Sequence, residues 1–172
     1  MVSRVIPVDP FDLTIFGGTG DLAKRKILPG LFRRHLSGQM PQEAQIIGAA
    51  RSELSDEEYR GIVRAAVLEF GAIEHSDADL DEFLARVSYL HVDAKGSAGW
   101  TALKSKMRDG FVRAFYFSVA PALFGDLAER LHEHDIALRD SRIVVEKPFG
   151  KDLETARALN GTLAKHFHED QI

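Results

Sequence analysis

The chain has 172 residues, the size of one ordinary domain, and its 45% hydrophobic and 28% charged residues are typical of a soluble globular protein. Lys and Arg number 22 against 26 Asp and Glu, a net charge of -4, so no overall positive field would attract nucleic acid or an anionic membrane. The lack of cysteine excludes disulfides and fits a reducing compartment, and with no signal peptide or membrane-length apolar run we expect a cytoplasmic protein.

Apolar runs alternate with amphipathic stretches along the chain. The apolar runs predict strands at residues 11–16, 45–50, 87–92, 111–119 and 143–145. The amphipathic stretches predict helices at residues 21–37, 55–70, 77–85 and 100–107, and two more after residues 120 and 150. Pro29 and Gly30 fall inside the first helix and should kink or interrupt it. Ser55 and Glu58 form a capping box at the start of the second.

The alternation of strands and helices predicts the fold class. It is typical of right-handed βαβ crossovers, which build a parallel sheet covered on both faces. The wholly apolar run at residues 143–145 fits a strand buried on both sides. The prediction is therefore an α/β fold, a doubly wound, Rossmann-like and mostly parallel sheet with helices on both faces. Such sheets bind ligands beyond the carboxyl ends of their strands.

A glycine-rich segment lies between the first strand and the first helix. It consists of Gly17, Gly18, Thr19, Gly20, Asp21, Leu22 and Ala23. The segment reads G-x-G-x-x-A from its second glycine, and its glycines allow a tight turn whose backbone N–H groups approach a pyrophosphate. The helix N-terminus adds a favourable dipole. The strand before and the helix after favour dinucleotide binding over a plain turn.

The residue after the second strand indicates which dinucleotide the site would bind. An NAD site usually has an acidic side chain there, which accepts a hydrogen bond from the ribose 2′-hydroxyl. This chain has Arg51, whose guanidinium suits a 2′-phosphate, and Thr19 offers a hydroxyl from the loop. We therefore expect NADP rather than NAD. The alternatives are that Arg51 is a solvated surface residue or that Glu53 takes the acidic role.

Two further residues are candidates for the same edge of the sheet. The strand at residues 143–145 delivers Lys147 to the edge where a nicotinamide would lie, and a lysine there can bind an anionic or hydroxylated substrate. Pro148 permits a cis peptide that would fix the direction of this side chain. The alternative is that Lys147 is surface charge and Pro148 starts the last helix. Tyr116 could line the cofactor groove, although aromatic strand residues usually pack in the core.

No pattern predicts a metal site. The pairs His132/His134 and His166/His168 are two residues apart, about 200° around a helix, so neither pair chelates one ion. The acidic run at residues 77–82 lacks the glycine and terminal glutamate of an EF-hand.

Together these segments resemble the glucose-6-phosphate dehydrogenase family. The matching stretches are FGGTGDLAKRKILPGLF (residues 16–32), IIGAARS (46–52), FYFSVAP (115–121) and IVVEKPFGKDL (143–153), in the order of the family. A weaker match covers residues 89–94. The resemblance implies cofactor contacts from Gly17, Gly18, Thr19, Gly20, Asp21, Leu22, Ala23, Lys24, Arg51, Asp93, Ala94, Tyr116 and Lys147. It implies that Lys147 also touches the sugar phosphate.

The implied reaction is oxidation of glucose 6-phosphate to its lactone by hydride transfer to NADP, the entry to the pentose phosphate pathway. Residues 1–172 would be the NADP-binding domain, without the substrate domain. The resemblance also implies a catalytic histidine in an Asp-His-Tyr context, which none of the seven histidines has. We therefore expect this chain alone to bind NADP weakly and to turn over no substrate.

Glucose 6-phosphate binding by this chain alone is expected to be weak or absent, and the full-length protein is expected to be a homo-oligomer. Two alternatives remain open. Glucose–fructose-oxidoreductase-like proteins share the Glu-Lys-Pro corner formed here by residues 146–148. A naturally short, non-catalytic NADP-binding module would need no substrate domain.

Overall fold

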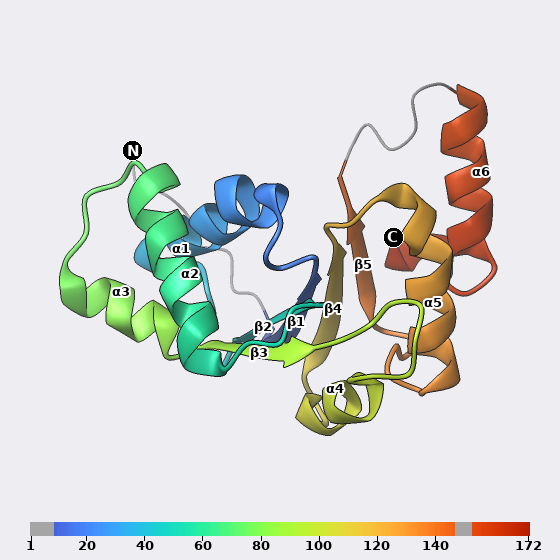
Figure 1. The fold of residues 1–172 in the computed structure, drawn as a ribbon, viewed down its shortest axis with the longest axis horizontal. Helices are drawn as coiled ribbons and strands as arrows, with labels where there is room; N and C mark the ends of the chain where they lie inside the picture. The colour runs from blue at the N-terminus through green and yellow to red at the C-terminus, as the bar shows by residue number, and fades with distance from the viewer. Residues whose placement is uncertain (1–8, 147–152) are drawn as a thin grey trace.

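The computed structural model describes residues 9–146 and 153–172 (Figure 1). In this part of the chain one parallel sheet has the strand order β3-β2-β1-β4-β5. The strands are β1 (Phe11–Phe16), β2 (Gln45–Ala50), β3 (Val87–His91), β4 (Val112–Phe117) and β5 (Arg142–Val145). The helical segments are η1 (Ala23–Ile27), α1 (Leu28–Leu36), α2 (Asp56–Phe70), α3 (Asp77–Leu84), α4 (Trp100–Lys106), η2 (Pro121–Leu123), α5 (Phe124–Glu133), α6 (Leu153–Ala164) and η3 (Glu169–Gln171). The predicted doubly wound α/β fold is confirmed.

The strand order reverses at the centre of the sheet. From β1 the chain moves outward through β2 to β3, then returns to the other side of β1 for β4 and β5. Phe16, the last residue of β1, pairs in register with Ala49 of β2 and Phe117 of β4. The three strands therefore end side by side, and the segments that follow them meet at the switch point, where such sheets bind ligands.

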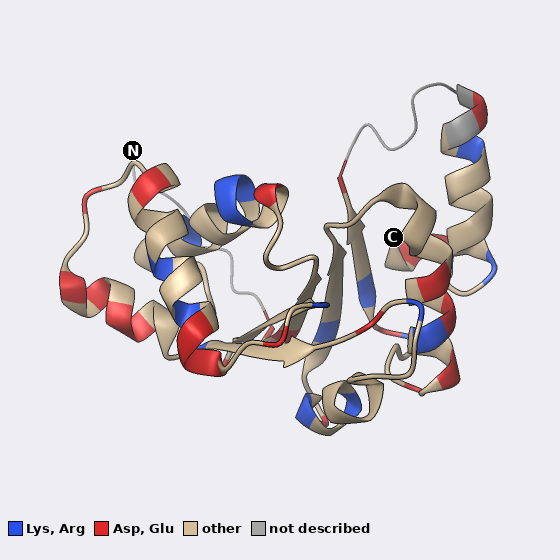
Figure 2. Ribbon diagram, in the orientation of Figure 1, with Lys and Arg blue, Asp and Glu red and all other residues tan. Residues whose placement is uncertain are grey.

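Helices cover the two faces of the sheet and form two hydrophobic cores (Figure 1). On one face, η1, α1, α2 and α3 bury large side chains such as Tyr59 and Phe83. On the other, side chains of α4, α5 and α6, including Leu131 of α5, pack with Phe115 of β4. Lysine, arginine and acidic residues are interspersed over the surface, as the small net charge suggests (Figure 2).

The first helical stretch passes through Pro29 without a break. In η1, a π-turn, the N–H of Leu28 donates to the carbonyl of Ala23, five residues earlier. Pro29 follows within the first turn of α1 and has no N–H to donate. In a regular α-helix its ring would clash with the carbonyl four residues before it. In place of the expected kink or break, the structure has a local widening of the helix just before Pro29.

The prediction that residues 143–145 are buried on both sides is wrong. The strand β5 lies at an edge of the sheet and, among the described residues, pairs with β4 alone. Ile143 is buried, but Val144 on the opposite face is 38% exposed. A short apolar run looks the same whether one or both faces are covered.

Candidate functional site

The glycine-rich loop leaves β1 at the switch point and turns sharply at Gly17. This residue has a φ of +81°, and a Cβ there would overlap the carbonyl of Ser118. The N–H of Gly17 donates to the carbonyl of Ala49 over 2.8 Å, and the N–H of Gly20 donates to the carbonyl of Gly17 over 3.0 Å. Because the loop is held between the ends of β2 and β4, only glycine fits at its first position.

A helical stretch starts directly after this loop. The N–H of Lys24 donates to the carbonyl of Gly20 over 3.1 Å. The N–H groups of a first helical turn lack partners within the helix and carry the positive end of its dipole, which suits a phosphate. Ala23 is fully buried, so the helix lies close to the sheet. The side chains of Asp21 and Lys24 line a separate hollow against α2, and Leu22 packs on the core.

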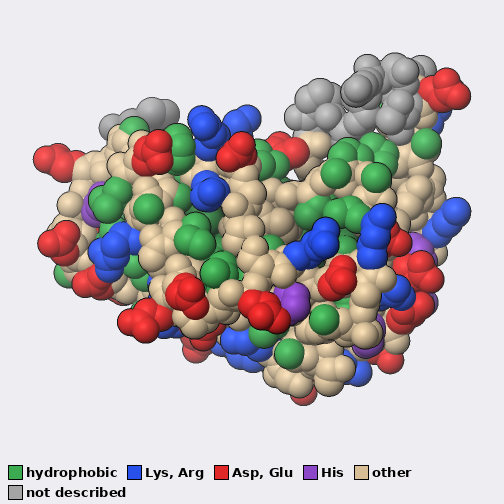
Figure 3. All heavy atoms as spheres, viewed as in Figure 1, with side chains coloured by type: hydrophobic (Ala, Val, Ile, Leu, Met, Phe, Trp, Pro, Cys, Tyr) green, Lys and Arg blue, Asp and Glu red, His purple; other side chains and the backbone are tan. Residues whose placement is uncertain are grey.

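A cavity of about 260 Å³ lies beside the loop at the carboxyl ends of the central strands. Its lining residues are Phe16, Gly17, Thr19, Ala49, Ala50, Arg51, Ser52, Val92, Ala94, Val119, Leu123 and Leu127. Figure 3 shows hydrophobic side chains on this face of the molecule near α5. Of the lining residues, Leu123 belongs to η2 and Leu127 to α5. A mostly apolar hollow with a few polar groups is typical of a ligand site.

The charged side chain at the cavity is Arg51. It follows β2 directly, is exposed, and lines the cavity together with Thr19 of the glycine-rich loop. The alternative candidate, Glu53, does not line the cavity and is 86% exposed, with its carboxylate 3.8 Å from Nδ1 of His91. The geometry therefore favours an anionic group over a ribose hydroxyl at this place.

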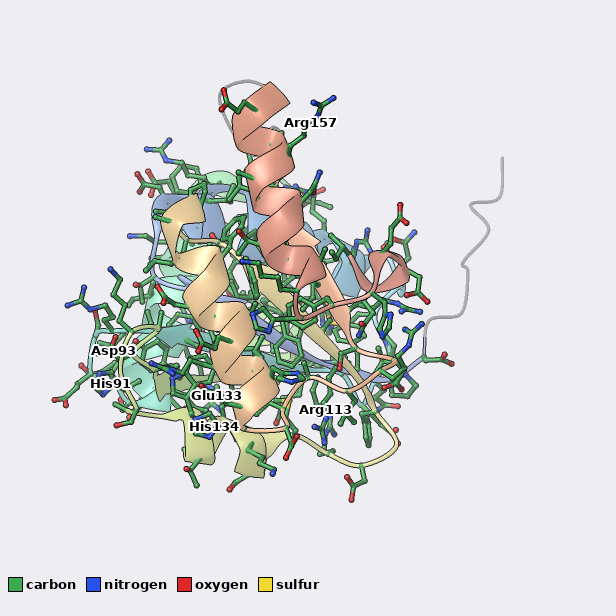
Figure 4. All side chains as sticks on the ribbon, turned by 90° about the vertical axis from the view of Figure 1, so that its right-hand side faces the viewer. His91, Asp93, Arg113, Glu133, His134 and Arg157 are labelled. Atoms are coloured by element: carbon green, nitrogen blue, oxygen red, sulfur yellow. The ribbon has the colours of Figure 1, made fainter. Side chains whose placement is uncertain are left out.

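Asp93 follows β3 and lies close to His91 (Figure 4), and Ala94 is the next residue. Ala94 lines the cavity. The carboxylate of Asp93 instead accepts from the N–H of Lys95 over 3.1 Å, and its carbonyl accepts from the indole N–H of Trp100 over 3.0 Å. Asp93 thus shapes the loop that carries Ala94.

Tyr116 lies in a different hollow, about 410 Å³ in volume, between α1 and the strands β4 and β5. Its hydroxyl donates to Oε1 of Glu146 over 3.0 Å. Burial, helped by this hydrogen bond, raises the pKa of Tyr116 to about 12, so the phenol stays protonated at neutral pH. The structure does not bring Tyr116 into the cavity of Arg51. Lys147 and Pro148 lie outside the described residues.

Histidines approach one another across helices rather than along them. The rings of His132 and His166, at the ends of α5 and α6, lie 5.8 Å apart.

Within residues 9–146 and 153–172, no three His, Cys, Asp or Glu side chains form a group that could hold a metal ion. None of the helices described there has the length and apolarity needed to cross a membrane.

Two tyrosines that the sequence does not single out for this site lie beneath its loops. The hydroxyl of Tyr59 donates to the carbonyl of Gly18 over 2.9 Å, and that of Tyr89 donates to the carbonyl of Ser52 over 2.6 Å. The partners are 41 and 37 residues apart. Periodicity and local motifs carry no signal for such distant contacts.

Comparison with known proteins shows which sequences this chain resembles. Residues 14–172 match the family model for the glucose-6-phosphate dehydrogenase NAD binding domain. The chain is 46% identical over 175 residues to glucose-6-phosphate 1-dehydrogenase of Rhizobium meliloti, covering 100% of this chain and 36% of that protein. The enzyme of the same name from Gluconobacter oxydans is 43% identical over 170 residues. The match covers 96% of this chain and 35% of that protein.

Solved structures of such enzymes have the same fold. Glucose-6-phosphate 1-dehydrogenase from Mycobacterium avium gives a TM-score of 0.86 at 34% identity, covering 95% of this chain and 35% of that one. A glucose-6-phosphate dehydrogenase in complex with its substrate glucose-6-phosphate gives a TM-score of 0.80 at 34% identity. The match covers 99% of this chain and 37% of that one. The chain spans about a third of the length of these relatives. It belongs to the glucose-6-phosphate dehydrogenase family and corresponds to the NAD-binding domain of that family.

Proposed function

We propose that this chain is the NADP-binding domain of a glucose-6-phosphate 1-dehydrogenase, which oxidises glucose 6-phosphate to its lactone. The observation that carries the proposal is the cavity at the switch point, where Gly17, Thr19 and Arg51 meet. Membership of the family supports the substrate and the reaction.

The residues of the cavity fit a phosphorylated dinucleotide. The loop around Gly17 has no room for a side chain and leads into a helix N-terminus, which suits the diphosphate. Arg51 and Thr19 provide a guanidinium fork and a hydroxyl for the 2′-phosphate. When bound, NADP supplies the acceptor for the hydride that leaves C1 of the sugar. These side chains bind and orient it, and Lys147 is proposed to touch both nucleotide and sugar phosphate.

We further propose that the chain by itself turns over no substrate. Removing a hydride from a sugar carbon needs a positioned base to take the hydroxyl proton. None of the seven histidines is in the Asp-His-Tyr context expected of that base. In the described residues, His132 and His166 lie at the ends of α5 and α6, and neither lines the cavity.

Titration with both nucleotides tests the binding proposal. Trp100 is the single tryptophan of the chain, fully buried, with its ring 5.7 Å from that of Phe16 at the start of the loop. Its fluorescence should therefore change on binding, and NADP should bind more tightly than NAD. Equal affinities would contradict the role of Arg51, and no binding of either would overturn the proposal. Robust lactone formation by the chain would contradict the predicted inactivity.

A further inference from the structure

Two buried tyrosines lie side by side on the opposite face of the sheet from most of the buried lining of the cofactor cavity. Tyr59 of α2 and Tyr89 of β3 are 0% and 4% exposed, and their ring centroids are 5.0 Å apart with 40° between the ring planes. Their hydroxyls reach two different loops. Tyr59 donates to Gly18 in the glycine-rich loop, and Tyr89 donates to Ser52 in the loop that carries Arg51.

Two glycines, one in the glycine-rich loop and one in β2, make room for the side chain of Tyr59. A Cβ on Gly18 would lie 2.7 Å from the hydroxyl oxygen of Tyr59, and a Cβ on Gly48 of β2 would overlap the ring itself. The side chain thus fills the space that both glycines leave. Burial, with a smaller contribution from Tyr89, raises the pKa of Tyr59 well above its usual value, so the hydroxyl remains a donor.

Tyr89 holds both ends of the loop at residues 51–55. Its hydroxyl donates to the carbonyl of Ser52, and its backbone N–H donates to Oδ1 of Asp56 over 2.8 Å at the start of α2. Arg51 directly precedes the tied residue Ser52, and Arg51, Ser52 and Glu53 are all exposed. Burial raises the pKa of Tyr89 above its usual value, which already lies above neutral pH, so its hydroxyl is a donor. The direction of the Arg51 backbone therefore depends on this tyrosine.

We propose that the tyrosine pair divides nucleotide recognition. Tyr89 is a positioning residue for the 2′-phosphate, because it fixes the loop that presents Arg51, and it therefore contributes to the preference for NADP over NAD. Tyr59 positions the glycine-rich loop, which contacts the diphosphate that both nucleotides share. The inference rests on the proposed function.

Phenylalanine at each position gives a matched pair of variants, because each removes one hydroxyl and keeps the contact between the two rings. In the 172-residue chain, Tyr89→Phe should raise the Kd for NADP about three- to tenfold, the effect of one neutral hydrogen bond, and that for NAD less than about twofold. Tyr59→Phe should raise both Kd values by a similar factor. Calorimetric titration with NADP and NAD measures all of them.

Combining Tyr89→Phe with Arg51→Ala separates positioning from general damage. If Tyr89 acts through Arg51, then in the Arg51→Ala background Tyr89→Phe should leave the NADP affinity unchanged within about twofold. Asp56→Ala, which cuts the other tie of the loop, should also lower the NADP affinity selectively. If thermal unfolding shows that Tyr89→Phe does not fold, Asp56→Ala still tests whether this loop determines the NADP affinity.

The outcomes are distinguishable. An unsubstituted chain that binds neither nucleotide overturns the proposed function and this inference with it. A chain that prefers NADP, but whose Tyr89→Phe and Asp56→Ala variants weaken NADP and NAD equally or not at all, overturns the inference alone. An NADP loss from Tyr89→Phe that persists in full without Arg51 also overturns it.

Discussion

Arg51 is the single basic side chain that lines the cavity within the described residues, and it should decide between the two nucleotides. Arg51→Ala is expected to raise the Kd for NADP about 10- to 100-fold, because hydrogen bonds to charged groups are worth about 1.5–3 kcal/mol. The affinity for NAD should hardly change, since NAD has no 2′-phosphate. Titration calorimetry with both nucleotides measures the difference.

The matched control is Arg64→Ala. Arg64 lies on α2, pairs with Asp81 of α3 and does not line the cavity, so its removal should leave both affinities unchanged. A similar NADP loss in both variants would indicate a general charge effect. It would contradict a contact between Arg51 and the 2′-phosphate.

Gly17 is the position of the loop that tolerates a side chain least. Gly17→Ala should lower the free energy of unfolding by more than the roughly 1–2 kcal/mol of a left-handed residue, because the new Cβ also meets the carbonyl of Ser118. It should weaken NADP and NAD together. Gly38→Ala is the control, because Gly38 has a φ of +74° but open space around it. Urea unfolding would contradict the argument if the two variants were equally destabilised.

At the residue scale, sequence predicts what lies next to the end of an element. Gly17 and Arg51 each follow a strand directly, and Thr19 lies two residues after Gly17, so the parallel topology brings the three together. Tyr59 and Tyr89 reach the same loops through the packing of α2 on β3, which no local pattern encodes. A resemblance places Tyr116 near the cofactor, whereas the structure leaves it in a separate hollow; its proposed contact remains a prediction.

At the scale of elements, the start of α2 is fixed by its capping box. The side chain of Ser55 accepts from the N–H of Glu58, and that of Glu58 accepts from the N–H of Ser55. Ser55→Ala should lower the free energy of unfolding by about 1 kcal/mol, measured by urea denaturation. Ser105→Ala is the control, because this exposed hydroxyl of α4 merely donates to the carbonyl of Thr101. Its effect should stay within about 0.5 kcal/mol, and an equal loss in both would contradict the capping argument.

Elements were predictable where hydrophobic periodicity and capping agree, as in α2. They were less so where tertiary packing decides. A proline inside a helical pattern predicts a departure from the regular helix, but whether the helix breaks or widens depends on the neighbouring turn. Here the π-turn η1 accommodates Pro29. The apolar run of β5 predicts a strand correctly. Its place at the sheet edge depends on strand order, which the run does not contain.

At the scale of the whole molecule, the edge at β5 is the most exposed apolar feature of the sheet. Val144 and Ile172 are 38% and 43% exposed, and both line a hollow of about 720 Å³ beside the strand. A strand with an unpaired edge and apolar side chains is a template for pairing with another chain. Among the described residues no strand covers the outer edge of β5.

The 172-residue chain is therefore expected to self-associate through β5 as its concentration rises. Val144→Lys should shift the association to higher concentration, because pairing would then bury a charge, and light scattering after size-exclusion chromatography measures the mass. Leu68→Lys is the control, since Leu68 is 61% exposed on α2, away from the sheet edge. If both lysines acted alike, association would reflect general hydrophobicity rather than the edge. A monomeric unsubstituted chain at every concentration would show that β5 does not pair.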